Sequence, residues 1–193
     1  MTIFLILAPY GAFAVLMMLT SAAVSLFVTA AICLATIAID HFVRGRSIKM
    51  LAAGSVVTFA AIGCYVLLVD AGMSVSAVKF AVDAGVLLII LASIAARRPF
   101  TLQYALEEVD AETAKFPGFI RANYVITWVW AASMLAMMLG NVTLIYVPGL
   151  PIWLSLLVAF AARNSAVYFT KWYPEYRKAR HGTPSATALP GTH

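Results

Sequence analysis

Long hydrophobic segments, separated by short polar connections, fill most of this 193-residue chain. Each segment has about the length that an α-helix needs to cross the ~30 Å hydrocarbon core of a bilayer. The pattern predicts an all-α integral membrane protein, built as one bundle of about six transmembrane helices within residues 1–173. The expected spans are residues 2–19, 22–39, 51–69, 77–96, 124–144 and 152–170.

The boundary between the first two expected spans has no Gly or Pro to mark it. A single helix over residues 2–39 would be about 60 Å long at 1.5 Å per residue, which is too long for a bilayer. We therefore expect a sharp break near residues 19–22. Pro9 and Gly11 interrupt the first segment, so a re-entrant half-helix, which leaves five spans, is the alternative. No Lys or Arg precedes this segment, and we expect a retained helix rather than a cleaved signal peptide.

Charged residues are scarce, and most of the basic ones are clustered. Asp, Glu, Lys and Arg make up 11% of the chain, whereas a soluble domain carries roughly a quarter. Lys and Arg gather in alternate connections, as the positive-inside rule describes, so we expect both termini in the cytoplasm. The net charge of +5 then reports topology, and no nucleic-acid partner is expected. The basic clusters are Arg44, Arg46 and Lys49; Arg97, Arg98, Lys115 and Arg121; and Lys171, Arg177, Lys178 and Arg180. Residues 174–193 are expected to form a disordered cytoplasmic tail.

Four polar residues interrupt the hydrophobic segments: Lys79, Asp83, Arg163 and Asn164. Lys79 and Asp83 are one helical turn apart, so they can neutralise each other as a structural pair; a solute or proton site is the alternative. Arg163 stays charged at any relevant pH and needs an acceptor, as a structural anchor or as part of a ligand site. By helix depth, Asp83 is expected roughly 10 Å too far toward the external side to be that acceptor. Asp40 or the acidic residues of the loop at 97–123 are expected to lie closer.

The segment at 77–96 also carries small residues on one face. Ala77, Ala81 and Gly85 follow one another at four-residue spacing, with Lys79 and Asp83 on the opposite face. Small residues let membrane helices approach closely. We therefore expect this helix to lie at the centre of the bundle.

The sequence gives no positive sign of catalysis. It contains no Ser-His-Asp set, HExxH motif, phosphate-binding loop or dinucleotide fingerprint. Cys33 and Cys64 lie in apolar segments without a second ligand at metal-binding spacing, and the three histidines are scattered. We expect a non-enzymatic protein with no metal and no cofactor.

The longest polar stretch, residues 97–123, is expected to form a cytoplasmic loop. Pro99 ends the preceding span, and Thr101 is a plausible N-cap. Leu102, Leu106, Val109 and Phe116 approximate a helical stripe, which predicts a short amphipathic helix along the membrane surface. Its role is either a solvated cap that closes the bundle or a contact surface for a partner.

Part of this loop resembles a known family. The run RRPFTLQYA, its acidic continuation and the FIRAN segment that enters a helix with Trp128 and Trp130 resemble small bacterial proteins labelled intracellular septation protein A-like. The resemblance is concentrated in residues 97–130. It implies a polytopic protein of the bacterial inner membrane, tied to cell division and envelope maintenance, with no enzyme chemistry and no agreed active site to transfer.

Two functional hypotheses follow. In the first, an interaction protein in the lipid bilayer uses the loop to contact division or envelope-synthesis membrane proteins, and a homo-oligomer is left open. Its candidate contact residues are Arg97, Arg98, Pro99, Phe100, Leu102, Tyr104, Arg121 and Asn123. In the alternative, a small transporter or lipid-handling protein uses Lys79, Asp83, Arg163 and Asn164 to line a polar path.

Overall fold

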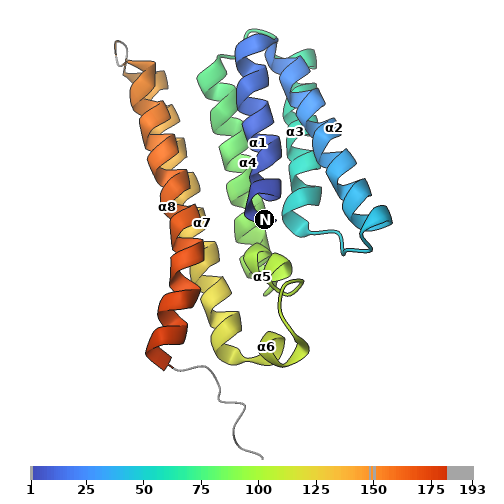
Figure 1. Cartoon of the computed structure of the whole chain (residues 1–193). Coiled ribbons are helices and arrows are strands. Elements are labelled where there is room, and N and C mark those ends of the chain that lie inside the picture. The colour runs from blue at the N-terminus through green and yellow to red at the C-terminus, as the bar shows by residue number, and fades with distance from the viewer. Residues whose placement is uncertain (1, 148, 150, 182–193) are drawn as a thin grey trace, which may run out of the picture.

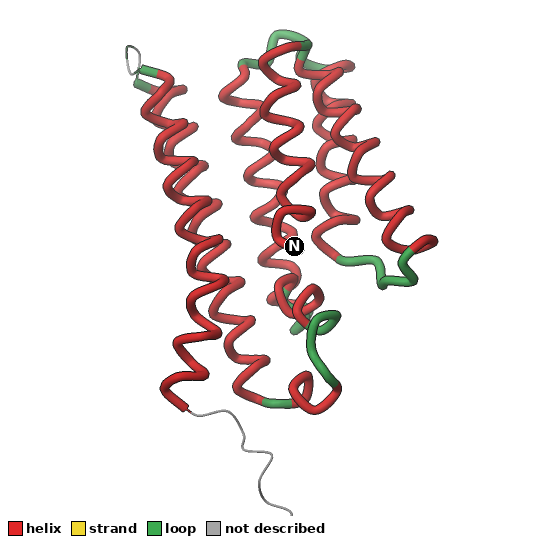
Figure 2. Tube along the Cα trace, in the orientation of Figure 1, coloured by secondary structure: helices red, strands yellow, loops and turns green. Residues whose placement is uncertain are grey.

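The computed structural model describes residues 2–147, 149 and 151–181 (Figure 1). The described residues form helices joined by turns and loops (Figure 2), with eight α-helices and one π-helical turn. The helices are α1 (Thr2–Leu19), α2 (Ala22–Ala38), α3 (Met50–Leu68), α4 (Val75–Ala95), α5 (Phe100–Ala105), α6 (Ala111–Lys115), α7 (Pro117–Tyr146) and α8 (Ile152–His181). The π-helical turn, Ile39–Val43, continues α2.

Four of these helices are long and apolar enough to cross a membrane. They are Ala22–Val43, Met50–Leu68, Val75–Ala95 and Pro117–Thr143. This confirms the prediction of an all-helical protein with several helices of membrane-spanning length. Helix α1 contributes a shorter apolar stretch, Ala8–Leu19, among the described residues.

The expected break between the first two spans is confirmed, and Ser21 produces it by capping the N-terminus of α2. Ser21 adopts an extended conformation and accepts a hydrogen bond from the Val24 N–H at 3.4 Å, which is an N-cap. The Thr20 hydroxyl donates to the Leu16 carbonyl at 2.9 Å and so satisfies the end of α1. The interruption expected at Pro9 is wrong, because α1 continues through it from Thr2 to Leu19.

The long helices run up and down, and their connections lie at two ends of the molecule (Figure 1). We call the end with the α1–α2 and α3–α4 turns the hairpin end, and the end with α5 and α6 the loop end. Helices α7 and α8 lie side by side along their length and extend beyond the other long helices at the loop end.

Helix α4 is central, as its small residues predicted. It packs against α3 on one side and α7 on the other. A Cβ atom on Gly85 would overlap the Thr58 side chain of α3, and one on Gly54 of α3 would lie 2.7 Å from Ile89 Cδ1 of α4. The two helices therefore approach closely because each has a glycine at the contact.

Two expected boundaries at the loop end are wrong. Helix α7 begins at Pro117 rather than at 124, so Arg121 and Asn123 lie on it. Helix α8 continues past 170 and through Pro174 to His181, so residues 174–181 of the expected disordered tail are helical, and 182–193 lie outside the described residues. The rings of Trp172 and Tyr176 stack with centroids 4.9 Å apart. Arg177 donates to the Gly118 carbonyl of α7 at 3.2 Å, which holds the extension against its neighbour.

The close approach of α3 and α4 predicts the effect of a single methyl group. Gly85→Ala should lower the free energy of unfolding in detergent by about 1–3 kcal/mol, since Thr58 is stiff at χ1 and presents its Cγ2, Oγ1 and Cβ atoms to the new methyl. Gly11→Ala in α1 is the control, because a Cβ there meets nothing within 4 Å. Equal thermal melting of both variants and the parent would contradict this packing.

Candidate functional site

The loop between α4 and α7 folds back onto the bundle as two short helices, not the single amphipathic helix expected. Thr101 is not an N-cap: Pro99 precedes α5, and Thr101 is buried inside it. The Thr101 hydroxyl instead donates to the Asn123 carbonyl at 2.8 Å and lies 2.7 Å from the Thr127 hydroxyl, both on α7. The loop is therefore anchored to the start of α7.

The second short helix, α6, begins at an acidic cap. The Asp110 carboxylate accepts a hydrogen bond from the Thr113 N–H at 2.7 Å. This bond favours the charged form and lowers the pKa of Asp110 below its ordinary value. The cap explains why the predicted stripe is interrupted, because Asp110 starts a new helix after a turn.

An ion pair between a buried lysine and a more exposed glutamate ties the loop to the start of α3. Lys49 is 4% exposed, and its ammonium lies 2.9 Å from the Glu107 carboxylate and 5.0 Å from the centre of the Tyr104 ring. The Gln103 side chain accepts a hydrogen bond from the Met50 N–H at 2.8 Å, which caps α3. Burial raises the pKa of Tyr104 above its ordinary value. One acidic residue of the loop, Glu107, is thus paired with a buried basic residue of α3's N-terminal end, whereas Asp110 and Glu112 are exposed.

The eight candidate contact residues of the loop divide into three groups. Pro99, Phe100 and Asn123 are buried, and the Phe100 ring meets Trp130 edge-on. Leu102 and Tyr104 are half-buried. The exposed ones are Arg97, Arg98 and Arg121. Most of the apolar side chains predicted to face a partner therefore pack into the protein itself.

A cavity of about 450 Å³ lies behind this loop, lined by residues of α1, α3, α4, α5, α7 and α8. Its walls are mainly apolar and include Val86 and Ile90 of α4. Helix α7 contributes side chains at three- and four-residue spacing from Phe119 to Met137, a stretch of about 27 Å at 1.5 Å per residue. The cavity is elongated along α7, and its volume is typical of small-molecule sites.

Polar side chains meet at the inner end of the cavity, toward the hairpin end. Asp83, Arg163 and Tyr10 line it, and the Asn141 amide of α7 donates to the Asp83 carboxylate at 2.9 Å. Arg163 and Lys79 both attract this carboxylate electrostatically. The Nε atom of Arg163 is buried and has no hydrogen-bond partner. Four different helices therefore supply the groups of this inner end.

The structure bears on two expectations about these polar residues. Within the described residues, no ion pair joins Lys79 to Asp83; Lys79 attracts the Asp83 carboxylate electrostatically, and this carboxylate accepts a hydrogen bond from Asn141. Within the same residues no ion pair joins Arg163 to Asp83 either, but both side chains line one cavity. Counted from the starts of α4 and α8, the two residues are about 12 and about 17 Å deep, and an arginine side chain leans toward the N-terminus of its helix. Asn164 faces outward and donates to the Phe160 carbonyl of its own helix at 2.7 Å.

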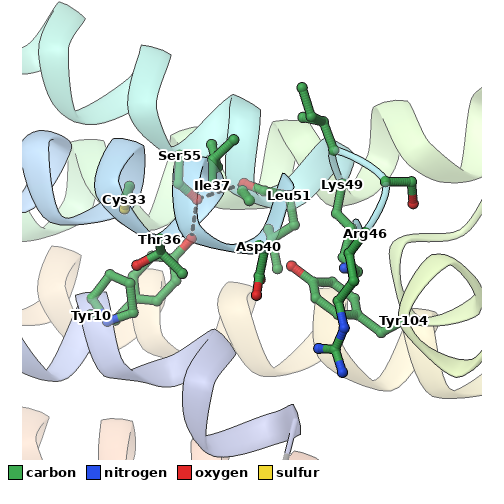
Figure 3. Close-up of a pocket in the computed structure, with 14 residues that line it drawn as sticks. Tyr10, Cys33, Thr36, Ile37, Asp40, Arg46, Lys49, Leu51, Ser55 and Tyr104 are labelled. Atoms are coloured by element: carbon green, nitrogen blue, oxygen red, sulfur yellow. Dashed lines mark hydrogen bonds between the residues drawn. The ribbon is translucent and has the colours of Figure 1, made fainter. Parts of the chain in front are cut away.

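The other end of the cavity lies at the loop. Thr101, Tyr104 and Asn123 line it together with Glu108 and Lys171. A smaller pocket of about 60 Å³ adjoins it, and Tyr10, Leu51 and Tyr104 line both. Figure 3 shows this smaller pocket, in which the Ser55 hydroxyl lies 2.6 Å from the Tyr10 hydroxyl and donates to the Leu51 carbonyl.

Sequence reasoning found Asp83 and Arg163 but missed Tyr10 and Asn141. Both are polar side chains within apolar segments, the signal that singled out Asp83, and a search extended to uncharged residues includes them. The apolar wall has no comparable signal, because a Met and aromatic stripe on a membrane helix is equally typical of packing or of lipid contact.

No family model, curated protein or solved structure matches this chain. Among the described residues, no group of three or more His, Cys, Asp or Glu side chains is placed to hold a metal ion. The fold and the cavity define the class of protein: a helical protein with four helices able to cross a membrane and an amphiphilic cavity among them. The resemblance to the septation proteins stays a prediction.

The Lys49–Glu107 pair predicts that the loop depends on one carboxylate. Glu107→Gln leaves the buried Lys49 ammonium without its counter-charge, and this should lower the free energy of unfolding by about 1–2 kcal/mol, because Glu107 itself is accessible to solvent. Protease cleavage within residues 105–112 should become faster as the loop detaches. Glu112→Gln, an exposed residue of the same loop, is the control. If both variants resist cleavage like the parent, the pair does not hold the loop.

Proposed function

We propose that this protein binds an amphiphilic small molecule, a lipid or lipid-like solute, in its central cavity, as a small transporter or lipid-handling membrane protein. The main observation in support of this proposal is the cavity of about 450 Å³, which has an apolar wall and ionisable groups at both ends. Polar groups that line a cavity within a membrane bundle mark solute paths. The proposal involves no catalysis and no cofactor.

The proposal places six helices across the membrane. Helix α8 lies alongside α7, which is long and apolar enough to cross, and α1 packs along α2. Lys and Arg concentrate at the loop end: at Arg44, Arg46 and Lys49, at Arg97 and Arg98, at Lys115 and Arg121, and on α8 from Lys171 onward. The positive-inside rule supports a loop end in the cytoplasm of a multi-pass protein, and the family resemblance supports a bacterial inner membrane.

The two functional hypotheses are now unequally supported. The interaction hypothesis relied on Phe100, Leu102 and Tyr104 as an outward surface, and these side chains are buried or half-buried. The transport hypothesis relied on Asp83 and Arg163 sharing a path, and both line the cavity. Its depth also suits transport, because transporter sites lie near the bilayer midplane.

Covalent labelling with a photoreactive fatty-acyl probe in nanodiscs tests the cavity. The probe should label the inward stripe of α7, at Ile126, Trp130 and Met134, because an acyl chain fits the apolar wall. Val86→Phe fills the cavity and should reduce this labelling at least fivefold. Leu139→Phe, which is 66% exposed on the outer face of α7, should leave it unchanged.

Labelling confined to outward residues such as Leu135 and Leu139, and insensitive to Val86→Phe, would contradict the proposal. Melting of each variant must remain within a few degrees of the parent for the comparison to count, so that a lost cavity is separated from a lost fold.

A second function is favoured by two apolar side chains that remain outside. Leu106 is 43% exposed and Phe116 is 50% exposed, and they flank the acidic residues Asp110 and Glu112 of the loop. Exposed apolar side chains rimmed by polar ones are typical of protein-contact sites. A division or envelope-synthesis protein that contacts the loop would meet this outer face rather than the residues predicted from sequence.

In-cell photo-crosslinking separates this second function from the first. A crosslinking residue at Phe116 should give a discrete protein adduct if the outer face of the loop is a contact site. The same residue at Phe100, which is buried against Trp130, should give none. Absence of any adduct from either position would leave the cavity as the function and remove the interaction role.

A further inference from the structure

The inner end of the cavity holds two opposite charges that do not meet. Asp83 on α4 and Arg163 on α8 line the same space, yet within the described residues no ion pair joins them. The Asp83 carboxylate instead accepts a hydrogen bond from the Asn141 amide on α7. The unpartnered Nε of Arg163 leaves one donor of the guanidinium available.

Separated charges at this depth are costly in the absence of a partner. An ionised group inside a membrane bundle requires a counter-charge, a hydrogen-bond partner or water. Arginine presents five N–H donors in a planar fork that suits a carboxylate or phosphate. Asp83 accepts one hydrogen bond from Asn141 and has lone pairs left for a further donor.

We propose that the ligand is a zwitterion joined to an apolar chain. This inference rests on the proposed function and names the chemistry of its substrate. The ligand's anionic group, a phosphate or carboxylate, binds Arg163, and its cationic amine binds Asp83. One molecule thereby supplies the counter-charges of both residues that line the cavity.

The apolar wall of the cavity indicates where the hydrocarbon part of the proposed ligand lies. From Met137, next to the charged end, the inward stripe of α7 passes Met134, Trp130 and Ile126 before it reaches Asn123. This stretch is about 21 Å long at 1.5 Å per residue. A single hydrocarbon chain running toward the loop end covers it. A lysophospholipid with an ethanolamine headgroup has all three parts, and a free amino acid with an apolar side chain has the zwitterion with a shorter body.

Trp130 provides a direct signal for binding. Its ring lines the cavity and is 7% exposed, and its Nε1 donates to Thr170 at 3.0 Å. The other three tryptophans, Trp128, Trp153 and Trp172, are exposed on the outside of the protein. Replacing those three by Phe in the full chain leaves Trp130 as the reporter. A lysophosphatidylethanolamine with a brominated chain should quench its fluorescence saturably, and unbrominated lipid should reverse the quenching.

Variants of Asp83 and Arg163 test whether the ligand is a zwitterion. Asp83→Asn and Arg163→Gln should each weaken binding of lysophosphatidylethanolamine at least tenfold, and Arg163→Lys should restore part of the loss. Binding of the anionic lysophosphatidylglycerol should depend on Arg163 and be indifferent to Asp83→Asn. Asn164→Ala is the matched control, since Asn164 neighbours Arg163 in sequence but faces away from the cavity.

The outcomes separate the inference from the function it rests on. Equal quenching by both lipids, unchanged by Asp83→Asn, would overturn the zwitterion while the cavity still binds amphiphiles. Absence of saturable quenching by any brominated lipid would overturn both. Displacement of the brominated lipid by millimolar leucine would support the zwitterion and identify a free amino acid as its source; lack of displacement alongside lipid quenching would identify the lipid.

Discussion

Close packing of α4 against both α3 and α7 joins the two halves of this molecule. On one side the contact depends on Gly85 and Gly54, which let α3 and α4 approach. On the other, Val82, Val86 and Ile90 are buried among the helices. Helices α1–α3 and the α7–α8 pair are linked mainly through α4, so the space between the halves persists as a cavity. The same helix supplies Asp83 to that cavity, which couples its packing to its chemistry.

The loop end is closed by electrostatics rather than by apolar packing alone. Lys49 is nearly inaccessible, and the Glu107 carboxylate and the Tyr104 ring surround its ammonium. Removing the counter-charge of a buried ammonium is costly, so the contact of Glu107 with Lys49 favours one position of the loop. Thr101 adds hydroxyl bonds to α7. The loop is therefore part of the wall of the cavity, and only its outer face, around Leu106 and Phe116, is left for a partner.

Much of the fold could be predicted from the sequence because its determinants are local. Hydrophobic length predicted the four helices that can cross a membrane, and excess length predicted the break at Ser21. The split of the loop and the helical extension through Pro174 could not be predicted in this way. Both depend on contacts between residues far apart in sequence, such as Lys49 with Glu107 and Arg177 with Gly118. The sequence predicted that Asp83 and Arg163 could line one polar path, but the hydrogen bond from Asn141 to Asp83, which joins residues far apart in the chain, was not predicted.

The separation of Asp83 from Arg163 is the feature from which we infer a binding site rather than a structural anchor. Opposite charges in a low-dielectric interior attract strongly, so a purely structural pair is expected to close into direct contact. Here Asn141 donates a hydrogen bond to the Asp83 carboxylate, and Asp83 and Arg163 line the same cavity. An occupant that supplies both counter-charges relieves the cost on each side without moving a helix. Because Asp83 lies on α4 and Arg163 on α8, the proposed occupant would also bridge these two helices.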